Sequence, residues 1–236
     1  GAYLLAYALP RKKLVLTGRK PGVVQPLAPA AAESVIAAGR GWNNKDRHSA
    51  YDRLADAELL ARLGSWSPTV RERAAAALAR RKPPRVEAIS ALLDSAHLDT
   101  RVGACQALEE LRGAAAPAVP PLRRALQHDD LWLRVRAASA LAAIGQSALP
   151  ALPDLLERIA RDPSPDDPRG MEQRFIAAAV FSRMLNNAKS LEGVDRDQLR
   201  TAIARSLQNQ DGHARSQVSE LYRRLSYEDL QPLLPA

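Results

Sequence analysis

The stretch LDTRVGACQALEELRGAAAPAVPPLRRAL at residues 98–126 decides the fold, because residues 131–159, LWLRVRAASALAAIGQSALPALPDLLERI, repeat it 33 positions later. Eleven of the 29 aligned residues are identical. A fixed period of about 20–50 residues is typical of stacked repeat proteins, whose units cannot bury their apolar faces alone. We therefore expect an extended array of similar units, which usually presents a long surface to a partner.

The composition favours a core of small and aliphatic side chains. Hydrophobic residues make up 46% of the 236 residues but aromatic residues only 4%, so alanine, leucine, valine and isoleucine must fill the interior. No apolar run approaches the ~18 residues that a membrane-spanning helix needs. The lone cysteine, Cys105, excludes an internal disulfide. We expect its thiol to act as a small buried hydrophobe, in the place that Ala138 takes one repeat later.

Start and stop signals divide the chain from about residue 50 onward into helical hairpins. Asp99, Asp129 or Asp130, and Asp195 are typical of residues that begin helices, whereas Gly113 and Gly145 are typical of residues that end them. The second helices of the hairpins are spaced by 30, 33, 39 and 41 residues when each is anchored on one apolar position: Leu78, Leu108, Leu141, Val180 and Leu221. The pattern predicts an all-α fold, an α-solenoid of about five hairpins over residues 49–236 after an irregular N-terminal segment.

Two adjacent stretches resemble HEAT repeats. Residues 131–145, LWLRVRAASALAAIG, resemble the second helix of such a repeat, and residues 148–156, ALPALPDLL, resemble the first helix of the next. The earlier copy of the same motif reads RVGACQAL at residues 101–108. The resemblance covers residues 67–160 well and 170–225 loosely. It implies a HEAT-like α-solenoid whose second helices line the concave face, and it implies no chemistry.

A second resemblance involves the N-terminal side of the repeats. Residues 39–47, GRGWNNKDR, and residues 63–74, LGSWSPTVRERA, are similar to the start of the repeat portion in a family of large uncharacterised multidomain bacterial proteins. Members of that family carry a helical, toroid-like domain upstream. The resemblance implies that residues 3–18 end such a domain. We therefore expect residues 1–48 to be an N-terminal arm or the tail of a preceding domain.

The net charge of +8 is concentrated near the N-terminus. Residues 1–50 hold eight basic and two acidic side chains, so residues 51–236 are nearly neutral. The basic segment candidates for contact with nucleic acid or an anionic surface are Arg11, Lys12, Lys13, Arg19 and Lys20. A solvated domain end is the alternative, since few aromatic residues accompany these charges to stack on bases.

Arginines recur near the starts of the second helices, at Arg71, Arg101, Arg134, Arg174 and Arg215. One interpretation is a concave basic row that contacts phosphates or an acidic peptide. The other is an inter-repeat ladder, in which each arginine pairs with an aspartate or a carbonyl group of a neighbouring turn. Both interpretations stay open from the sequence. Arg136, one turn further along the same helix as Trp132, joins the candidates for partner binding.

Tryptophans are prominent in a chain with so few aromatic residues. Trp132 begins a helix at a site where the previous repeat has Asp99, and tryptophan is a frequent anchor of interfaces. Trp132 is therefore a candidate for contact with a partner, and a purely structural role is the alternative. Trp66 is expected to pack at the entry of its helix, and Trp42 to fix the N-terminal arm.

The sequence contains no recognisable catalytic motif. It lacks G-x-S-x-G, a glycine-rich phosphate loop and CxxC, and no His-Glu dipeptide occurs. His97 and His128 lie near acidic residues in adjacent repeats, but no metal site or cofactor is predicted from them. We predict a non-enzymatic module that binds a protein or another domain of a longer chain. The alternatives are nucleic-acid binding and an accessory role to an enzyme whose active site lies upstream.

Overall fold

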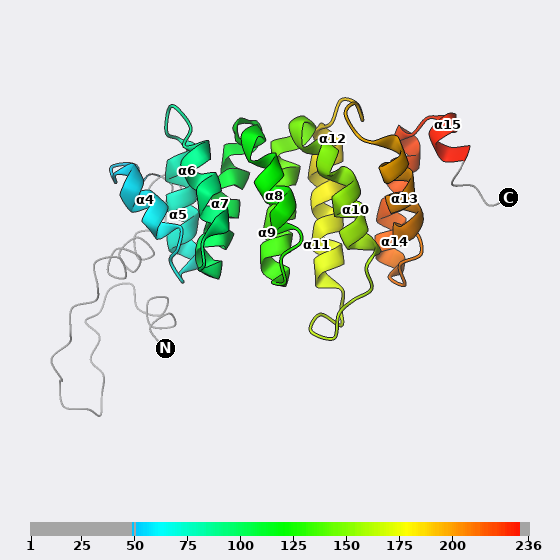
Figure 1. Cartoon of the computed structure of the whole chain (residues 1–236), viewed down its shortest axis with the longest axis horizontal. Coiled ribbons are helices and arrows are strands. Elements are labelled where there is room, and N and C mark those ends of the chain that lie inside the picture. Colours follow the sequence, from blue (N-terminus) through cyan, green and yellow to red (C-terminus); the bar gives the residue numbers. More distant parts are fainter. Residues whose placement is uncertain (1–48, 50, 232–236) are drawn as a thin grey trace, which may run out of the picture.

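The computed structural model describes residues 49 and 51–231, and within these ranges it is helical and contains no strand. Figure 1 shows a single row of upright helices running from α4 at one end to α14 at the other. The division into residues 1–48 and 49–236 stays a prediction, because residues 1–48 lie outside the described ranges. Among the described helices, none is long and apolar enough to cross a membrane.

Five helical hairpins make up the row in the described part of the chain, as the repeat spacing predicted (Figure 1). Each hairpin has a first helix and a second helix. The hairpins are α4 (Asp56–Arg62) with α5 (Pro68–Ala79); α6 (Val86–Ala91) and η1 (Leu92–Asp94) with α7 (Leu98–Leu111); η2 (Arg112–Ala118) and α8 (Val119–Ala125) with α9 (Leu131–Ile144); η3 (Gly145–Ala151) and α10 (Leu152–Ala160) with α11 (Met171–Ala179), η4 (Val180–Met184) and α12 (Leu185–Asn187); and α13 (Arg196–Ser206) with α14 (Gly212–Ser219) and η5 (Glu220–Arg224). The short helix α15 (Tyr227–Leu230) follows.

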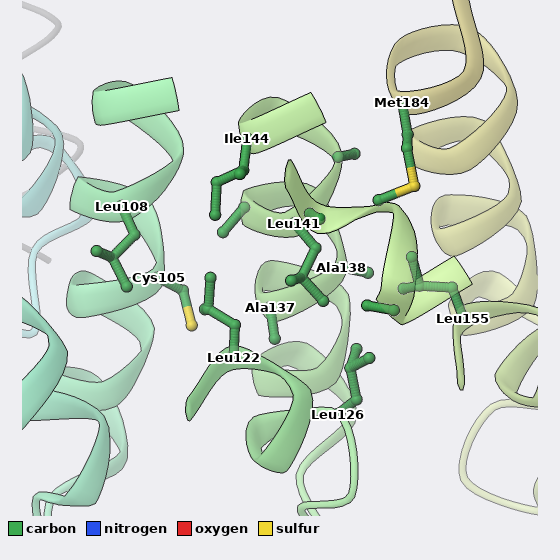
Figure 2. Packing of buried hydrophobic residues seen from close by; sticks show 14 of the residues in the cluster. Cys105, Leu108, Leu122, Leu126, Ala137, Ala138, Leu141, Ile144, Leu155 and Met184 are labelled. Atoms are coloured by element: carbon green, nitrogen blue, oxygen red, sulfur yellow. The ribbon is translucent and has the colours of Figure 1, made fainter. Parts of the chain in front are cut away.

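The core runs along the whole row because each second helix packs on the second helix of the next hairpin. Alanine occupies many of the facing positions, and residues such as Ala104, Ala137 and Ala138 are fully buried. Such small side chains let the helix axes approach closely, and leucines from both layers fill the remaining space (Figure 2). Cys105 belongs to the same buried cluster and is 0% exposed, as expected for a small hydrophobe.

Most of the expected helix starts are correct. The side chains of Asp130, Asp195 and Asp211 each accept a hydrogen bond from a backbone N–H in the first turn of the helix that follows. The start assigned to Asp99 is wrong by two residues. That helix begins at Leu98, and His97 precedes it without a side-chain cap.

The end of α7 differs from the expectation that Gly113 closes it. Arg112 takes the closing conformation instead, with φ 51° and ψ −133°. Its repeat equivalent Gly145 closes α9 with nearly the same angles, φ 75° and ψ −130°. The repeat geometry therefore imposes a positive φ at a position where this copy has a residue with a Cβ atom, which is strained.

We predict that Arg112→Gly raises the free energy of unfolding by about 1 kcal/mol. Relief of the strained backbone outweighs the extra chain entropy that glycine brings to the unfolded state. Urea unfolding of the two proteins measures the difference. The converse change Gly145→Ala should destabilise the chain, and a loss of stability in Arg112→Gly would contradict the assignment.

Gly103 allows α7 to approach the end of α4. A Cβ atom at this position would lie 2.0 Å from the carbonyl oxygen of Leu63, which is backbone and cannot rotate away. We predict that Gly103→Ala lowers the free energy of unfolding by at least about 1–3 kcal/mol, because the two hairpins must separate. Gly113→Ala is the matched control, since its nearest contact would be an ordinary 4.0 Å. Equal midpoints of thermal unfolding for the two variants would refute the close approach.

Candidate functional site

The recurring arginines occupy one structural position. Each is the fourth residue of the second helix of its hairpin, which places one arginine at the same height on every second helix. We call this set the arginine ladder: Arg71, Arg101, Arg134, Arg174 and Arg215. The alignment of Arg174 and Arg215 with the others is less evident in the sequence, because the spacing there is irregular.

Three members of the arginine ladder bind the turn that precedes their own helix. In each case a terminal guanidinium nitrogen donates to the backbone carbonyl oxygen six residues earlier, at Ser65, His128 and Asn209. The side chain of each of these turn residues accepts the N–H two residues further on. In these three hairpins a polar side chain in the turn and the ladder arginine together fix the turn between the two helices.

Three members also reach the next hairpin. Arg71 binds Asp99 at 3.1 Å, Arg134 binds Glu172 at 2.5 Å, and Arg174 binds Asp211 at 3.0 Å, as donor to carboxylate distances. The carboxylates lie at the second position of the following second helix, or at its N-cap in the case of Asp211. This geometry favours the inter-repeat ladder, since Arg71 and Arg134 are less than 10% exposed and face their neighbours rather than solvent.

The most buried part of the ladder is a cluster of three charges. Glu172 accepts hydrogen bonds from Arg134 and from Arg158 of α10, at distances between 2.5 and 3.1 Å. All three side chains are buried. Burial by itself raises the pKa of Glu172, but the hydrogen bonds and charges of the two arginines outweigh burial. The pKa is therefore below its usual value, and the carboxyl stays ionised into acid. The cluster joins the third and fourth hairpins.

Arg101 is the exception in the ladder. Its Nε is buried without a hydrogen-bond partner, and Arg101 forms no ion pair with any residue that the structure describes. Asp99 and Glu172 each occupy the second position of their helix, where they bind an arginine of the preceding hairpin. In α9 the same position holds Trp132. The nearby Asp130 instead caps α9 through the N–H of Leu133. Arg215, in the last hairpin, also has no carboxylate among the described residues, so Arg101 is the ladder arginine that lacks one although another second helix follows it.

Trp132 and Phe175 form an exposed aromatic pair at this point. Their ring centroids lie 6.0 Å apart, and the residues are 56% and 41% exposed. Arg136 lies one turn along α9 from Trp132, on the same face of the helix. We call Trp132 and Phe175, with Arg101 and Arg136 beside them, the aromatic patch. Ser139 and Ala143 continue the same partly exposed stripe with small side chains.

A salt bridge links the second and fourth hairpins directly. Arg183, in the π-helical segment η4, binds Glu109 of α7 with a distance of 2.5 Å. The two residues come from the second and fourth hairpins, so the pair passes over the hairpin between them. The bridge therefore links two second helices that are not neighbours in the row.

Sequence reasoning identified Trp132 but missed its neighbours. Phe175 has the spacing of a core residue in an apolar helix, and only the tertiary structure shows that it is exposed beside Trp132. Trp66 is 72% exposed in its turn, so the expected packing at the helix entry is wrong. The basic candidates Arg11, Lys12, Lys13, Arg19 and Lys20, together with Trp42, lie outside the described residues.

The remaining polar features carry no recognisable catalytic arrangement. The described ranges hold no group of three histidine, cysteine or acidic side chains placed to bind a metal ion. His128 is used within its turn, where its Nδ1 accepts the N–H of Asp130. Burial raises the pKa of Cys105 to about 12, which leaves its thiol unreactive in the folded state.

These observations define an α-solenoid whose second helices carry an internal arginine ladder and one exposed aromatic patch. A family model of HEAT repeats matches residues 86–173 of the chain. Together with the stacked hairpins, the match shows that residues 86–173 are HEAT repeats within an all-helical chain. HEAT repeats are generally protein-interaction scaffolds and are typically non-enzymatic. No curated protein matches the chain in sequence.

Proposed function

We propose that the chain is a non-enzymatic module that binds a protein, either a separate partner or another domain of a longer chain, through the aromatic patch. The observation that carries the proposal is the exposure of Trp132 and Phe175 side by side. Only 4% of the sequence is aromatic, and two of these side chains meet on the exposed surface of neighbouring second helices. Large aromatic residues dominate the energetics of protein interfaces.

Nucleic-acid binding through the ladder receives less support from the geometry. Phosphate recognition needs exposed guanidinium groups, whereas Arg71 and Arg134 are buried and already hydrogen-bonded to carbonyl and carboxylate groups. The bound carboxylates also neutralise the positive charge along the second helices. The accessory role beside an upstream active site is a case of intrachain docking and uses the same patch.

The proposal is tested with variants that remove the patch without disturbing the core. A protein that the wild-type chain retains on a column should be lost with Trp132→Ala/Phe175→Ala and kept with Trp66→Ala. Trp66 is the matched control, because it is also exposed but lies in the first hairpin, away from the patch. Circular dichroism should show the same helicity for all three proteins. Retention by the double variant would contradict the proposal.

A second measurement addresses the alternative directly. Labelled single- and double-stranded DNA and RNA are titrated with the full chain at low and near-physiological salt. Micromolar binding that weakens steeply with salt, and that falls when Arg11, Lys12 and Lys13 are neutralised, would favour the nucleic-acid alternative. We expect no such binding by the second helices.

A further inference from the structure

Resting on the proposed function, we propose that the aromatic patch binds a partner segment in which an aspartate or glutamate stands beside a bulky apolar residue. The carboxylate of the partner binds Arg101, and the apolar side chain packs on Trp132 and Phe175. The partner thereby supplies the acid that the arginine ladder lacks between the second and third hairpins.

The arginine ladder is regular on both sides of Arg101. Arg71 and Arg134 each bind a carboxylate at the second position of the following second helix. That position beside Arg101 holds Trp132 instead. The same register therefore places Arg101 at the helix end that carries Trp132, and no carboxylate of the described residues pairs with it there. The terminal nitrogens of Arg101 have no acceptor among the described residues, and a carboxylate binds such a guanidinium group with up to two parallel hydrogen bonds.

The charge around the aromatic patch is positive. Arg101 and Arg136 form no ion pair among the described residues. Four acids on the neighbouring helices and turns have other partners, since two arginines bind Glu172, Asp130 caps α9, Asp99 pairs with Arg71 and Glu109 pairs with Arg183. The patch therefore has an excess of positive charge in a repeat body that is nearly neutral, and charge complementarity selects an acidic partner.

The same surface also exposes large apolar side chains. Trp132 and Phe175 are large, exposed and adjacent, and Leu98, at the start of the neighbouring helix α7, is 38% exposed. Beyond Trp132 the stripe on α9 continues with Ser139 and Ala143. Small side chains there leave space for a partner backbone to lie close to the helix. The surface thus fits an apolar anchor with a carboxylate next to it.

The test uses short random peptides displayed on phage and selected on the full chain. Enriched peptides should share an acidic residue within a few positions of a bulky apolar residue. Replacement of that acid by its amide should weaken binding to the wild-type chain about tenfold or more. Arg101→Gln should weaken binding of the acidic peptide to the same extent and should not discriminate between acid and amide. Arg223→Gln is the matched control, because Arg223 lies in the last hairpin and its side chain is 79% exposed.

Charge reversal gives the sharpest outcome. Arg101→Glu should reject the acidic peptide and accept a version with lysine in place of the acid. If peptides bind at Trp132 and Phe175 but are indifferent to Arg101 and to the acid-to-amide change, this inference is overturned and the proposed function stands. If no selected peptide depends on Trp132 or Phe175, both the inference and the patch assignment fail. Changing the acid in the peptide keeps the test valid even if a variant at Arg101 does not fold.

Discussion

Glu172→Ala should lower the free energy of unfolding by about 3–5 kcal/mol, because it leaves two buried arginines without their carboxylate. Arg134 and Arg158 both donate to Glu172, and all three side chains are buried. Urea unfolding followed by circular dichroism at neutral pH measures the loss. Glu157→Ala is the matched control, since its pair with Arg205 also links two hairpins but is exposed, and such pairs contribute about 1 kcal/mol or less.

The same cluster predicts how stability depends on pH. The pKa of Glu172 is lowered from a usual value of 4.5 in the folded protein, so the unfolded chain takes up this proton first as the pH falls. Its contribution to stability is present above pH 4.5 and is lost as the pH falls through the lowered pKa. Glu172→Gln should flatten this part of the pH profile. A profile identical to that of the wild type would show that the carboxyl titrates normally.

A triple replacement separates charge burial from packing. If Arg134, Arg158 and Glu172 are all replaced by apolar residues of similar size, most of the lost stability should return, because no charge is then buried alone. Failure of the triple variant to recover would indicate that the hydrogen bonds of Arg134 to the turn at His128 and Asp129 dominate instead.

Leu141→Ala should cost about 2–5 kcal/mol and should loosen the hairpin before it as well as its own. Leu141 is fully buried in the cluster that also contains Cys105 of the preceding hairpin (Figure 2). Each repeat is stable only against its neighbours, so a cavity at Leu141 weakens the support of α7. The thiol of Cys105 reports on this loosening, because it reacts only when its surroundings open.

The measurement is the rate at which a thiol reagent labels Cys105 in native buffer. Wild-type protein should react very slowly, since Cys105 is 0% exposed and its pKa is raised to about 12. Leu141→Ala should accelerate labelling strongly. Leu221→Ala, an equally buried change in the last hairpin, should accelerate it far less. Equal acceleration by both variants would show that the row unfolds as one unit and would contradict nearest-neighbour stability.

Several features of the candidate site were predictable from the sequence and several were not. The recurrence of arginine at the start of the second helices was visible, and so was the exceptional Trp132. The pairing of the arginines was not, because Arg134 binds a glutamate that lies beyond an insertion of irregular length. Phe175 was not recognised either, since an apolar residue in an apolar helix carries no local sign of which face it takes.

The sequence by itself determined that the described chain is a row of helical hairpins, because the 33-residue repeat, the caps at Asp130 and Asp195 and the alanine-rich second helices are all local signals. Only the tertiary structure decided which arginines of the ladder bind an acid of the next hairpin and that Arg101 does not. It also decided that Arg112 takes the conformation expected for Gly113. The physical reason is that a repeat fixes the spacing within each unit, whereas contacts between units depend on how one helix is set against the next.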